Sequence, residues 1–270
     1  MRYENAPKSL GVLTVATNIY IDYWREMATS FDKYCKPNEN VVLHVFTNRL
    51  EEVQRIKSEL KNVLVVGHEI PDYRWPEATL LRYQIFNNAS EKFSEDVLMH
   101  LDADMLVTSS PLEKIFNASR DGQMCLVSHP GYWRPKGIHK QLHFYCMNIT
   151  LLFTDLRMIL RVGGLGSWET DSLSAAFVPR RNRRNYVCGG TWFGQKEVFL
   201  KLISELSRNV EKDLEREKVA VWHDESHLNS WSAQNSHELL DPSLCFVATY
   251  PQLAGLTSMI AAVEKKVATR

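Results

Sequence analysis

Residues 97–104 read V-L-M-H-L-D-A-D, an apolar run that ends in two aspartates. Three similar apolar runs precede it, at residues 10–17, 41–47 and 63–66. Segments with apolar residues at helical spacing separate these runs, at residues 20–34, 50–60 and 77–93. Short apolar runs that alternate with amphipathic helices are typical of βα units. The sequence therefore predicts an α/β fold with a largely parallel sheet.

The second half of the chain is less regular. We expect helices at residues 195–215 and from Asp224 onward, and connections rich in proline and glycine near 130–137 and 163–166. The sequence contains no internal repeat and no linker that would require a domain boundary. The 270 residues are therefore expected to form a single domain.

Composition argues against several classes of protein. The 32 Lys and Arg residues balance 32 Asp and Glu residues, so the chain lacks the net basic charge that is typical of nucleic-acid binding. No apolar run reaches the roughly 18 residues of a transmembrane segment, and residues 10–16 are too short for an export signal. The 5 cysteines are odd in number and lack C-x-x-C spacing, which is typical of reduced thiols. We expect a soluble, cytoplasmic protein, either free or at a membrane surface.

Asp102 and Asp104 lie where the run at 97–101 would end as a strand. Open α/β sheets bind ligands at the carboxyl ends of their strands. Two carboxylates 4 Å apart repel each other by roughly 4 kcal/mol at an effective dielectric constant of about 20. A divalent cation that also holds a diphosphate would remove this repulsion. The alternative is a solvated turn in which one aspartate caps the next segment.

A second polar run, W-H-D-E-S-H, occupies residues 222–227. His223 and His227 have the spacing of the zinc motif H-E-x-x-H, but Asp224 stands where that motif has its glutamate. In another interpretation, Asp224 caps a helix and Glu225 projects a carboxylate into a pocket, where it could serve sugar chemistry. A third interpretation is that residues 222–227 form an ordinary helix-capping segment with partly buried histidines.

Two further stretches leave alternatives open. The run C-G-G-T-W-F-G at 188–194 lacks the lysine of a phosphate-binding P-loop, and its paired glycines indicate either a close approach of the backbone to a ligand or strand, or a strand bulge. The loop 180–184 holds four arginines. It is typical of a solvated turn, a loop that contacts phosphate, or a small nucleic-acid patch.

The order of six motifs resembles glycosyltransferase family 6, the retaining α-1,3-galactosyl- and N-acetylgalactosaminyltransferases. The motifs are V-A-T-N-I-Y (15–20), R-W-P-E-A-T-L-L-R (74–82), D-A-D (102–104), S-H-P-G-Y-W (128–133), C-G-G-T-W-F-G (188–194) and V-W-H-D-E-S-H-L-N (221–229). The resemblance extends over nearly the whole chain. It implies a GT-A fold in which residues 1–130 form a Rossmann-like half that binds the nucleotide and metal, and residues 131–270 form the acceptor half.

The resemblance also implies a role for particular residues. Asp102 and Asp104 would bind Mn²⁺, or Mg²⁺ in its place, and Arg82 would hold the donor sugar and the metal-site carboxylates. The other residues implied in donor binding are Val15, Ala16, Thr17, Tyr20, Ala103, Cys188, Gly189, Gly190, Asp224 and Lys265, with Arg270 as a second tail residue. Acceptor contacts would come from His129, Trp222 and Glu225, and Asp224 and Glu225 would act with Arg82 in catalysis.

The expected function is transfer of galactose or an N-acetylhexosamine from a UDP-sugar to an oligosaccharide or glycolipid acceptor, with α linkage. Gly190 leaves room for an N-acetyl group, which favours N-acetylgalactosamine slightly. Glu225 would act either as a covalent nucleophile or as a stabiliser of an oxocarbenium-like state. Two rival hypotheses are a binding protein of the same fold without catalysis and a zinc hydrolase that uses His223 and His227.

Overall fold

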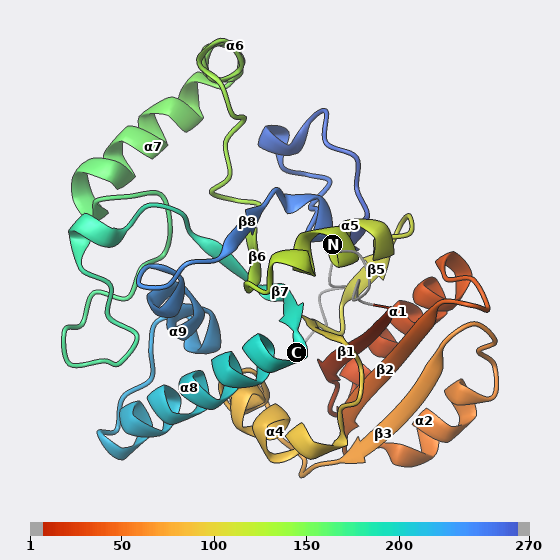
Figure 1. The fold of residues 1–270 in the computed structure, drawn as a ribbon. Coiled ribbons are helices and arrows are strands. Elements are labelled where there is room, and N and C mark those ends of the chain that lie inside the picture. Colours follow the sequence, from red (N-terminus) through yellow and green to blue (C-terminus); the bar gives the residue numbers. More distant parts are fainter. Residues whose placement is uncertain (1–7, 264–270) are drawn as a thin grey trace, which may run out of the picture.

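The computed structural model describes residues 8–263, and a seven-stranded sheet forms the centre of this part of the chain (Figure 1). The strand order is β3-β2-β1-β4-β7-β6-β8. The strands are β1 (Ser9–Val15), β2 (Asn40–Thr47), β3 (Leu64–Glu69), β4 (Val97–Leu101), β6 (Cys125–Ser128), β7 (Val187–Gln195) and β8 (Glu238–Leu240). Two short strands, β5 (Met105–Val107) and β9 (Ile260–Ala262), pair separately. The predicted α/β class is confirmed.

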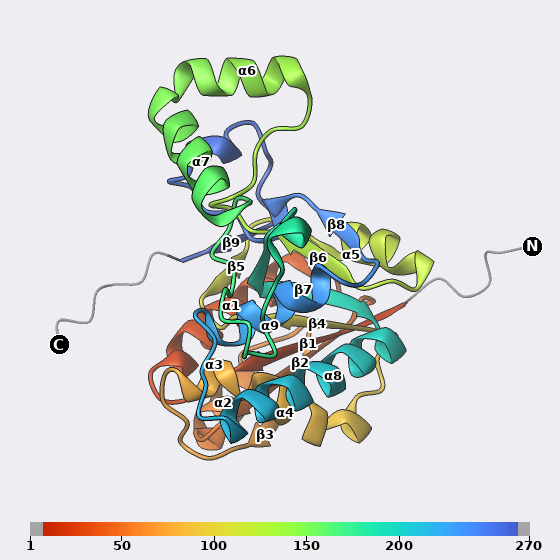
Figure 2. The same ribbon diagram turned by 90° about the vertical axis from the view of Figure 1, so that its left-hand side faces the viewer.

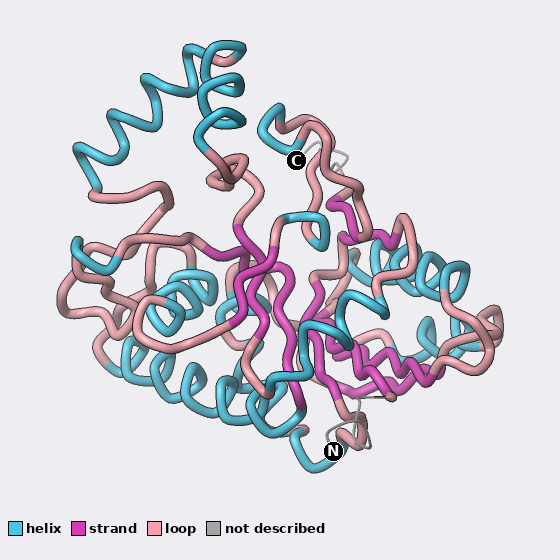
Figure 3. Tube along the Cα trace, turned by 45° about the horizontal axis from the view of Figure 1, so that its top comes forward, coloured by secondary structure: helices cyan, strands magenta, loops and turns pink. Residues whose placement is uncertain are grey.

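Helices surround the sheet, and most connections between strands are helical. They are α1 (Tyr20–Tyr34), α2 (Leu50–Lys57), α3 (Glu77–Leu80), α4 (Arg82–Asn88), α5 (Leu112–Ala118), α6 (Ile138–Met147), α7 (Ile149–Val162), α8 (Lys196–Glu215) and α9 (His223–Ser232). Figure 3 shows the strands in the middle of the described chain, with helices on both sides.

The first four strands of the sheet are parallel, as predicted. Strand β7 is different, because it runs antiparallel to both of its neighbours, β4 and β6. It therefore brings the glycine-rich stretch into the centre of the sheet, beside the end of β4. This pairing joins residues that are distant in sequence, so periodicity alone could not predict it.

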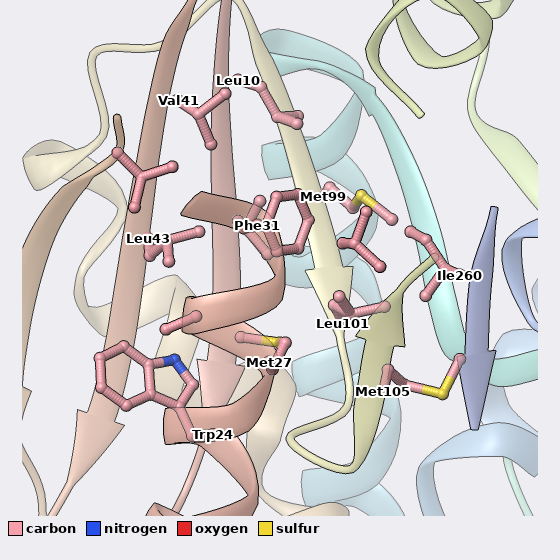
Figure 4. Close-up of a cluster of buried hydrophobic side chains, with 14 of the residues drawn as sticks. Leu10, Trp24, Met27, Phe31, Val41, Leu43, Met99, Leu101, Met105 and Ile260 are labelled. Atoms are coloured by element: carbon pink, nitrogen blue, oxygen red, sulfur yellow. The ribbon is translucent and has the colours of Figure 1, made fainter. Parts of the chain in front are cut away.

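One face of the sheet is covered by α1, whose buried residues follow a helical period. Trp24, Met27 and Phe31 pack against Leu10, Val41 and Leu43 of the neighbouring strands β1 and β2 (Figure 4). Met99 and Leu101 of β4 join the same cluster. The opposite face packs against α4 and α8, through buried side chains such as Phe86, Phe199 and Leu206. The sheet is therefore buried on both faces, as parallel strands require.

The predicted continuous helix at residues 77–93 is wrong. The chain leaves helical geometry at Leu81, where ψ is 2°, and again at Ala89, where ψ is 6°. The first break makes Arg82 the first residue of α4. The guanidinium of Arg82 is buried and points towards the end of β4. Because this contact is between residues that are distant in sequence, helical spacing does not reveal it.

Helices α6 and α7 form a hairpin that stands away from the sheet (Figures 1 and 2). A connection was expected at 130–137, and these two helices were not predicted from the sequence. Most of their apolar residues are partly or fully exposed, whereas Phe144 of α6 is buried.

The buried histidines of the described residues include His68, His100 and His227. Burial lowers the pKa of each imidazole from 6.5 to about 4, because the charged form loses its hydration. Unfolding returns these pKa values towards 6.5, so the unfolded chain binds more protons between about pH 4 and 6.5. The contribution of these histidines to the free energy of unfolding therefore falls as the pH drops through this window. Urea unfolding of the native protein and of histidine variants at pH 7.5, 6 and 5 measures this contribution.

His227 provides a specific check of this prediction. Its ring nitrogens hydrogen-bond to no residue in the range 8–263, and Nε2 lies 3.6 Å from Asp213 Oδ2. A His227→Leu variant should lose part of the acid dependence, since one buried titrating group is removed. His139→Leu, at an exposed position, is the control. Equal pH dependence in all three proteins would contradict the assignment.

Candidate active site

A cavity of about 470 Å³ opens at the carboxyl ends of β1 and β4. Three segments contribute its walls, as the topology of a parallel sheet predicts. The lining residues are Val15, Thr17, Asn18, Ile19, Tyr20, Asp72, Tyr73, Arg74, Trp75, Ala78, Thr79, Arg82, His100, Asp102, Ala103 and Asp104. Many residues implied in donor binding therefore meet at one cavity. Ala16 does not line it, because its side chain is fully buried in the core below.

Asp102 lies at the junction of β4 and β7. Its backbone N–H donates to the carbonyl of Gly190, at 3.0 Å. A Cβ atom on Gly190 would lie 2.8 Å from Asp102 Oδ2, so a side chain there would displace the Asp102 carboxylate. The close-approach interpretation of the glycine pair thus holds. The β6–β7 register is also irregular here, since the partner of Leu126 is Trp192 and that of Ser128 is Val187.

Arg82 connects Asp102, which lines the cavity, with Asp224 of α9, which does not. Its Nη1 atom donates to Asp102 Oδ1 at 2.9 Å, and its Nε atom lies 3.2 Å from Asp224 Oδ2. The guanidinium also donates to the carbonyls of Thr79 and Gly189, and it contacts His100. The residue is 5% exposed. One buried cation therefore joins β4, β7 and α9.

The charges of this cluster depend on burial. Burial acts to lower the pKa of Arg82, but Asp224 and Asp102 outweigh it and hold that pKa above its ordinary value. Arg82 is thus a permanent cation. Burial raises the pKa of Asp224 to about 7, and the attraction of Arg82 opposes this only in part. A buried carboxyl with a raised pKa, held by an arginine that lines a cavity, is typical of a functional site.

Glu225 faces the glycine pair from the first turn of α9. Its Oε2 atom accepts a hydrogen bond from the Gly189 N–H at 2.8 Å, and a Cβ atom on Gly189 would lie 2.9 Å from Glu225 Cβ. Burial raises the pKa of Glu225 to about 7, while the Gly189 N–H and the Tyr186 hydroxyl act to lower it. One interpretation predicted that Asp224 caps α9, and this is wrong. The Asp224 carboxylate faces Arg82 instead.

Cys188 packs between Cys245 and the glycine pair. Its Sγ atom lies 3.0 Å from Sγ of Cys245 and accepts a hydrogen bond from the Gly190 N–H at 3.4 Å, and both cysteines are buried. All five cysteines are free, as their spacing predicted. Cys188 does not line the cavity, so its contact with the donor stays a prediction.

The three residues implied in acceptor binding, His129, Trp222 and Glu225, lie outside the lining of this cavity. The His129 ring centroid is 4.8 Å from that of Tyr132 and 5.7 Å from that of Tyr186. Tyr186 is the residue whose hydroxyl acts to lower the pKa of Glu225. Burial lowers the pKa of His129 to about 4, so the ring is neutral at pH 7. Trp222 is 51% exposed at the start of α9. Lys265 and Arg270 lie outside the described residues.

The histidines of the W-H-D-E-S-H run contact different neighbours. The His223 ring packs edge-on against Trp75, at 5.3 Å, whereas His227 is buried beside Asp213. No group of three or more His, Cys, Asp or Glu residues between 8 and 263 is arranged to hold a metal ion. Nothing in this part of the chain supports the zinc-site interpretation.

The basic loop has a structural role that its composition did not reveal. Arg180 donates to the carbonyls of Ile159 and Leu160, and Arg183 donates to that of Val162. These are the last carbonyls of α7, which lack partners within the helix. Two of the four arginines therefore cap α7, and the cavity lining includes none of them.

His100 is a cavity residue that the sequence analysis missed. It lines the cavity and contacts both Arg82 and Asp102. The signal was available: His100 and Asp102 are two residues apart at the end of a strand, so their side chains share one face. Asp72, Tyr73 and Trp75 were also missed as lining residues, because they lie in a loop without periodicity.

A seven-stranded α/β sheet with carboxylates at its carboxyl edge is the arrangement of a GT-A-like glycosyltransferase fold. Residues 166–269 match the model of glycosyltransferase family 6, and the resemblance predicted from the motifs is thereby confirmed.

Two relatives from Rattus norvegicus align with most of the chain. Histo-blood group ABO system transferase 1 is 23% identical over 226 residues, which are 83% of this chain and 56% of the relative. Histo-blood group ABO system transferase 2 is 22% identical over 226 residues, 83% of this chain and 58% of the relative. The chain thus spans just over half the length of the curated relatives it matches.

Proposed function

We propose that this chain is a metal-dependent, retaining glycosyltransferase that moves galactose or N-acetylgalactosamine from a UDP-sugar to a glycan hydroxyl with α linkage. The observation that carries the proposal is the buried Arg82, which joins Asp102 at the cavity to Asp224 beside Glu225. The similarity to glycosyltransferase family 6 supports sugar transfer as the reaction that this cluster performs.

The donor diphosphate would lie at the carboxyl edge of the sheet. Asp102 and Asp104 both line the cavity, and carboxylate oxygens are the ligands that Mn²⁺ and Mg²⁺ prefer. The contact with Arg82 and the close approach of Gly190 hold Asp102 in place. These residues therefore fit a divalent cation, which when bound neutralises charge on the departing UDP. Tyr20 and Thr17, at the other wall, are in reach of the nucleoside.

The transferred sugar would lie between Asp224 and Glu225. The ionised carboxylate of Glu225 either attacks the anomeric carbon or stabilises positive charge that develops there. The Gly189 N–H fixes the direction of this carboxylate, and Arg82 fixes that of Asp224. His129 and Trp222 are proposed to contact the acceptor, an oligosaccharide or glycolipid.

The identity of the donor sugar is to be determined by measuring turnover with different UDP-sugars. The absence of a side chain at Gly190 was expected to make room for an N-acetyl group, but in the structure the Asp102 carboxylate is the group nearest to this position. Measuring UDP release from UDP-galactose, UDP-glucose and their N-acetyl forms, each with Mn²⁺ and with EDTA, tests the proposal. Turnover of one donor only with metal is expected, whereas UDP-sugar binding without release even when acceptors are supplied would favour a binding protein of this fold.

Removing one carboxylate of the D-A-D segment should weaken metal-dependent donor binding. We expect Mn²⁺ to raise the UDP affinity of the native protein, and Asp104→Asn to reduce this gain by at least about tenfold, because a neutral amide binds the cation less strongly. Titration calorimetry with UDP, with and without Mn²⁺, measures the effect independently of turnover.

Asp72→Asn is the matched control, since Asp72 lines the same cavity outside the D-A-D segment. It should keep the full Mn²⁺ effect. An Asp104→Asn protein with an unchanged Mn²⁺ effect would refute the metal assignment while leaving transferase activity open to test.

A further inference from the structure

The hairpin of α6 and α7 carries an apolar face that nothing in residues 8–263 covers. Ile149, Phe153, Leu156 and Leu160 recur at helical spacing along one side of α7, and their side chains are 52%, 65%, 47% and 76% exposed. We call these four residues the apolar stripe. A helix that faced the core would bury such a stripe, whereas the only fully buried residue of α7 is the polar Asp155.

Helix α6 extends the apolar surface. Its Ile138, Leu142 and Met147 are 70%, 59% and 73% exposed. Clustered apolar residues of this size on a surface mark an interaction site more often than chance. The hairpin stands away from the sheet in all three ribbon and tube views, so a flat partner could reach it (Figures 1, 2 and 3).

The charges around this surface have one sign. Residues 134–162 contain a single acid, Asp155, which is buried and paired with Arg134 at 2.6 Å. The exposed charged residues of the segment are Lys136, Lys140, Arg157 and Arg161. The exposed Arg180, Arg181 and Arg184 add cations at the end of α7 that Arg180 caps.

We propose that the hairpin binds the surface of a membrane that contains anionic lipids, with the apolar stripe inserted between headgroups and the cations in contact with them. Amphipathic helices of this composition lie in the interface plane. A second copy of this chain fits the surface less well, because a symmetric contact would bring cations against cations. No helix within residues 8–263 is long and apolar enough to cross a membrane.

Cys146 offers a direct readout of the contact. It is exposed near the end of α6, whereas the other four cysteines are buried, so a thiol-reactive, environment-sensitive dye will label it selectively. Vesicles of phosphatidylcholine with phosphatidylglycerol should shift the dye emission to the blue and sediment the protein. Vesicles of phosphatidylcholine alone should bind it at least about tenfold more weakly, and added salt should weaken binding to the anionic vesicles.

Variants separate the two contributions. Phe153→Asp with Leu160→Asp should reduce vesicle affinity by at least about tenfold, as should Arg157→Gln with Arg161→Gln. The controls are Leu64→Asp, which replaces an apolar residue that is 67% exposed on β3, and Arg55→Gln with Lys57→Gln on α2. All changed side chains are exposed, and circular dichroism checks that each variant is folded.

Native protein that ignores anionic vesicles overturns the proposal, as does vesicle binding that the hairpin variants do not change. A dimer that Phe153→Asp converts to a monomer, without vesicle binding, would instead assign the surface to a second copy. Because UDP release is measured without vesicles, failure here is distinct from failure of the proposed transfer activity.

Discussion

Replacing Glu225 by glutamine is expected to reduce sugar transfer by at least about 100-fold while UDP affinity stays nearly unchanged. The amide is neutral, so it can neither attack the anomeric carbon nor stabilise positive charge there. It keeps an oxygen that accepts the Gly189 N–H, so the local structure should survive. UDP release with the preferred donor measures turnover, and calorimetry with UDP and Mn²⁺ measures affinity.

Glu238→Gln on β8 is the control for this variant, because Glu238 is exposed. It should behave like the native protein in both measurements. Near-native turnover of Glu225→Gln would remove Glu225 from the chemistry. Equal loss of turnover and of UDP affinity would assign it a role in the structure of the donor site.

The second large effect is expected at Arg82. Arg82→Met removes a buried cation and leaves Asp102 and Asp224 without their partner. Breaking a buried ion pair in this way costs about 3–5 kcal/mol in the free energy of unfolding. Transfer should become undetectable, since the carboxylates at the metal site and the sugar site lose their common support. Urea unfolding and UDP release measure the two effects.

Two comparisons make this prediction specific. Arg82→Met combined with Asp224→Asn should recover part of the lost stability, because the uncompensated carboxylate is gone, but not the activity. Arg25→Met breaks an ion pair with Glu59 whose side chains are 52% and 51% exposed, so it should cost less than about 1 kcal/mol. If Arg82→Met costs no more than Arg25→Met, the central role of Arg82 is wrong.

The elements of the first half were largely predictable from the sequence. The range 20–34 agrees with α1, and the four apolar runs correspond to β1, β2, β3 and β4 within a few residues. Apolar periodicity is a local property of the sequence. In these segments the apolar positions that it identifies are also the ones that the folded protein buries. The same holds for Asp102 and Asp104, whose place follows from the end of a strand.

Other features could not be predicted because they depend on contacts across the chain. The helix break at Leu81 serves the burial of Arg82, and Gly190 lies against the Asp102 carboxylate. Four arginines in the loop 180–184 gave no sign of a partner in the sequence, yet two of them cap α7. Helix α7 was missed although its apolar residues recur at helical spacing, and only the structure shows that this face is exposed.

The sequence by itself determined the α/β class, the order of the motifs and the chemical groups available to the site. Only the tertiary structure decided which groups meet. Arg82 contacts the carbonyl of Gly189, which is 107 residues away, and the Tyr83 hydroxyl donates to the carbonyl of Asp224, which is 141 residues away. Secondary structure follows from local spacing, whereas the charge and direction of a site carboxylate follow from burial and from partners that the folded sheet brings together.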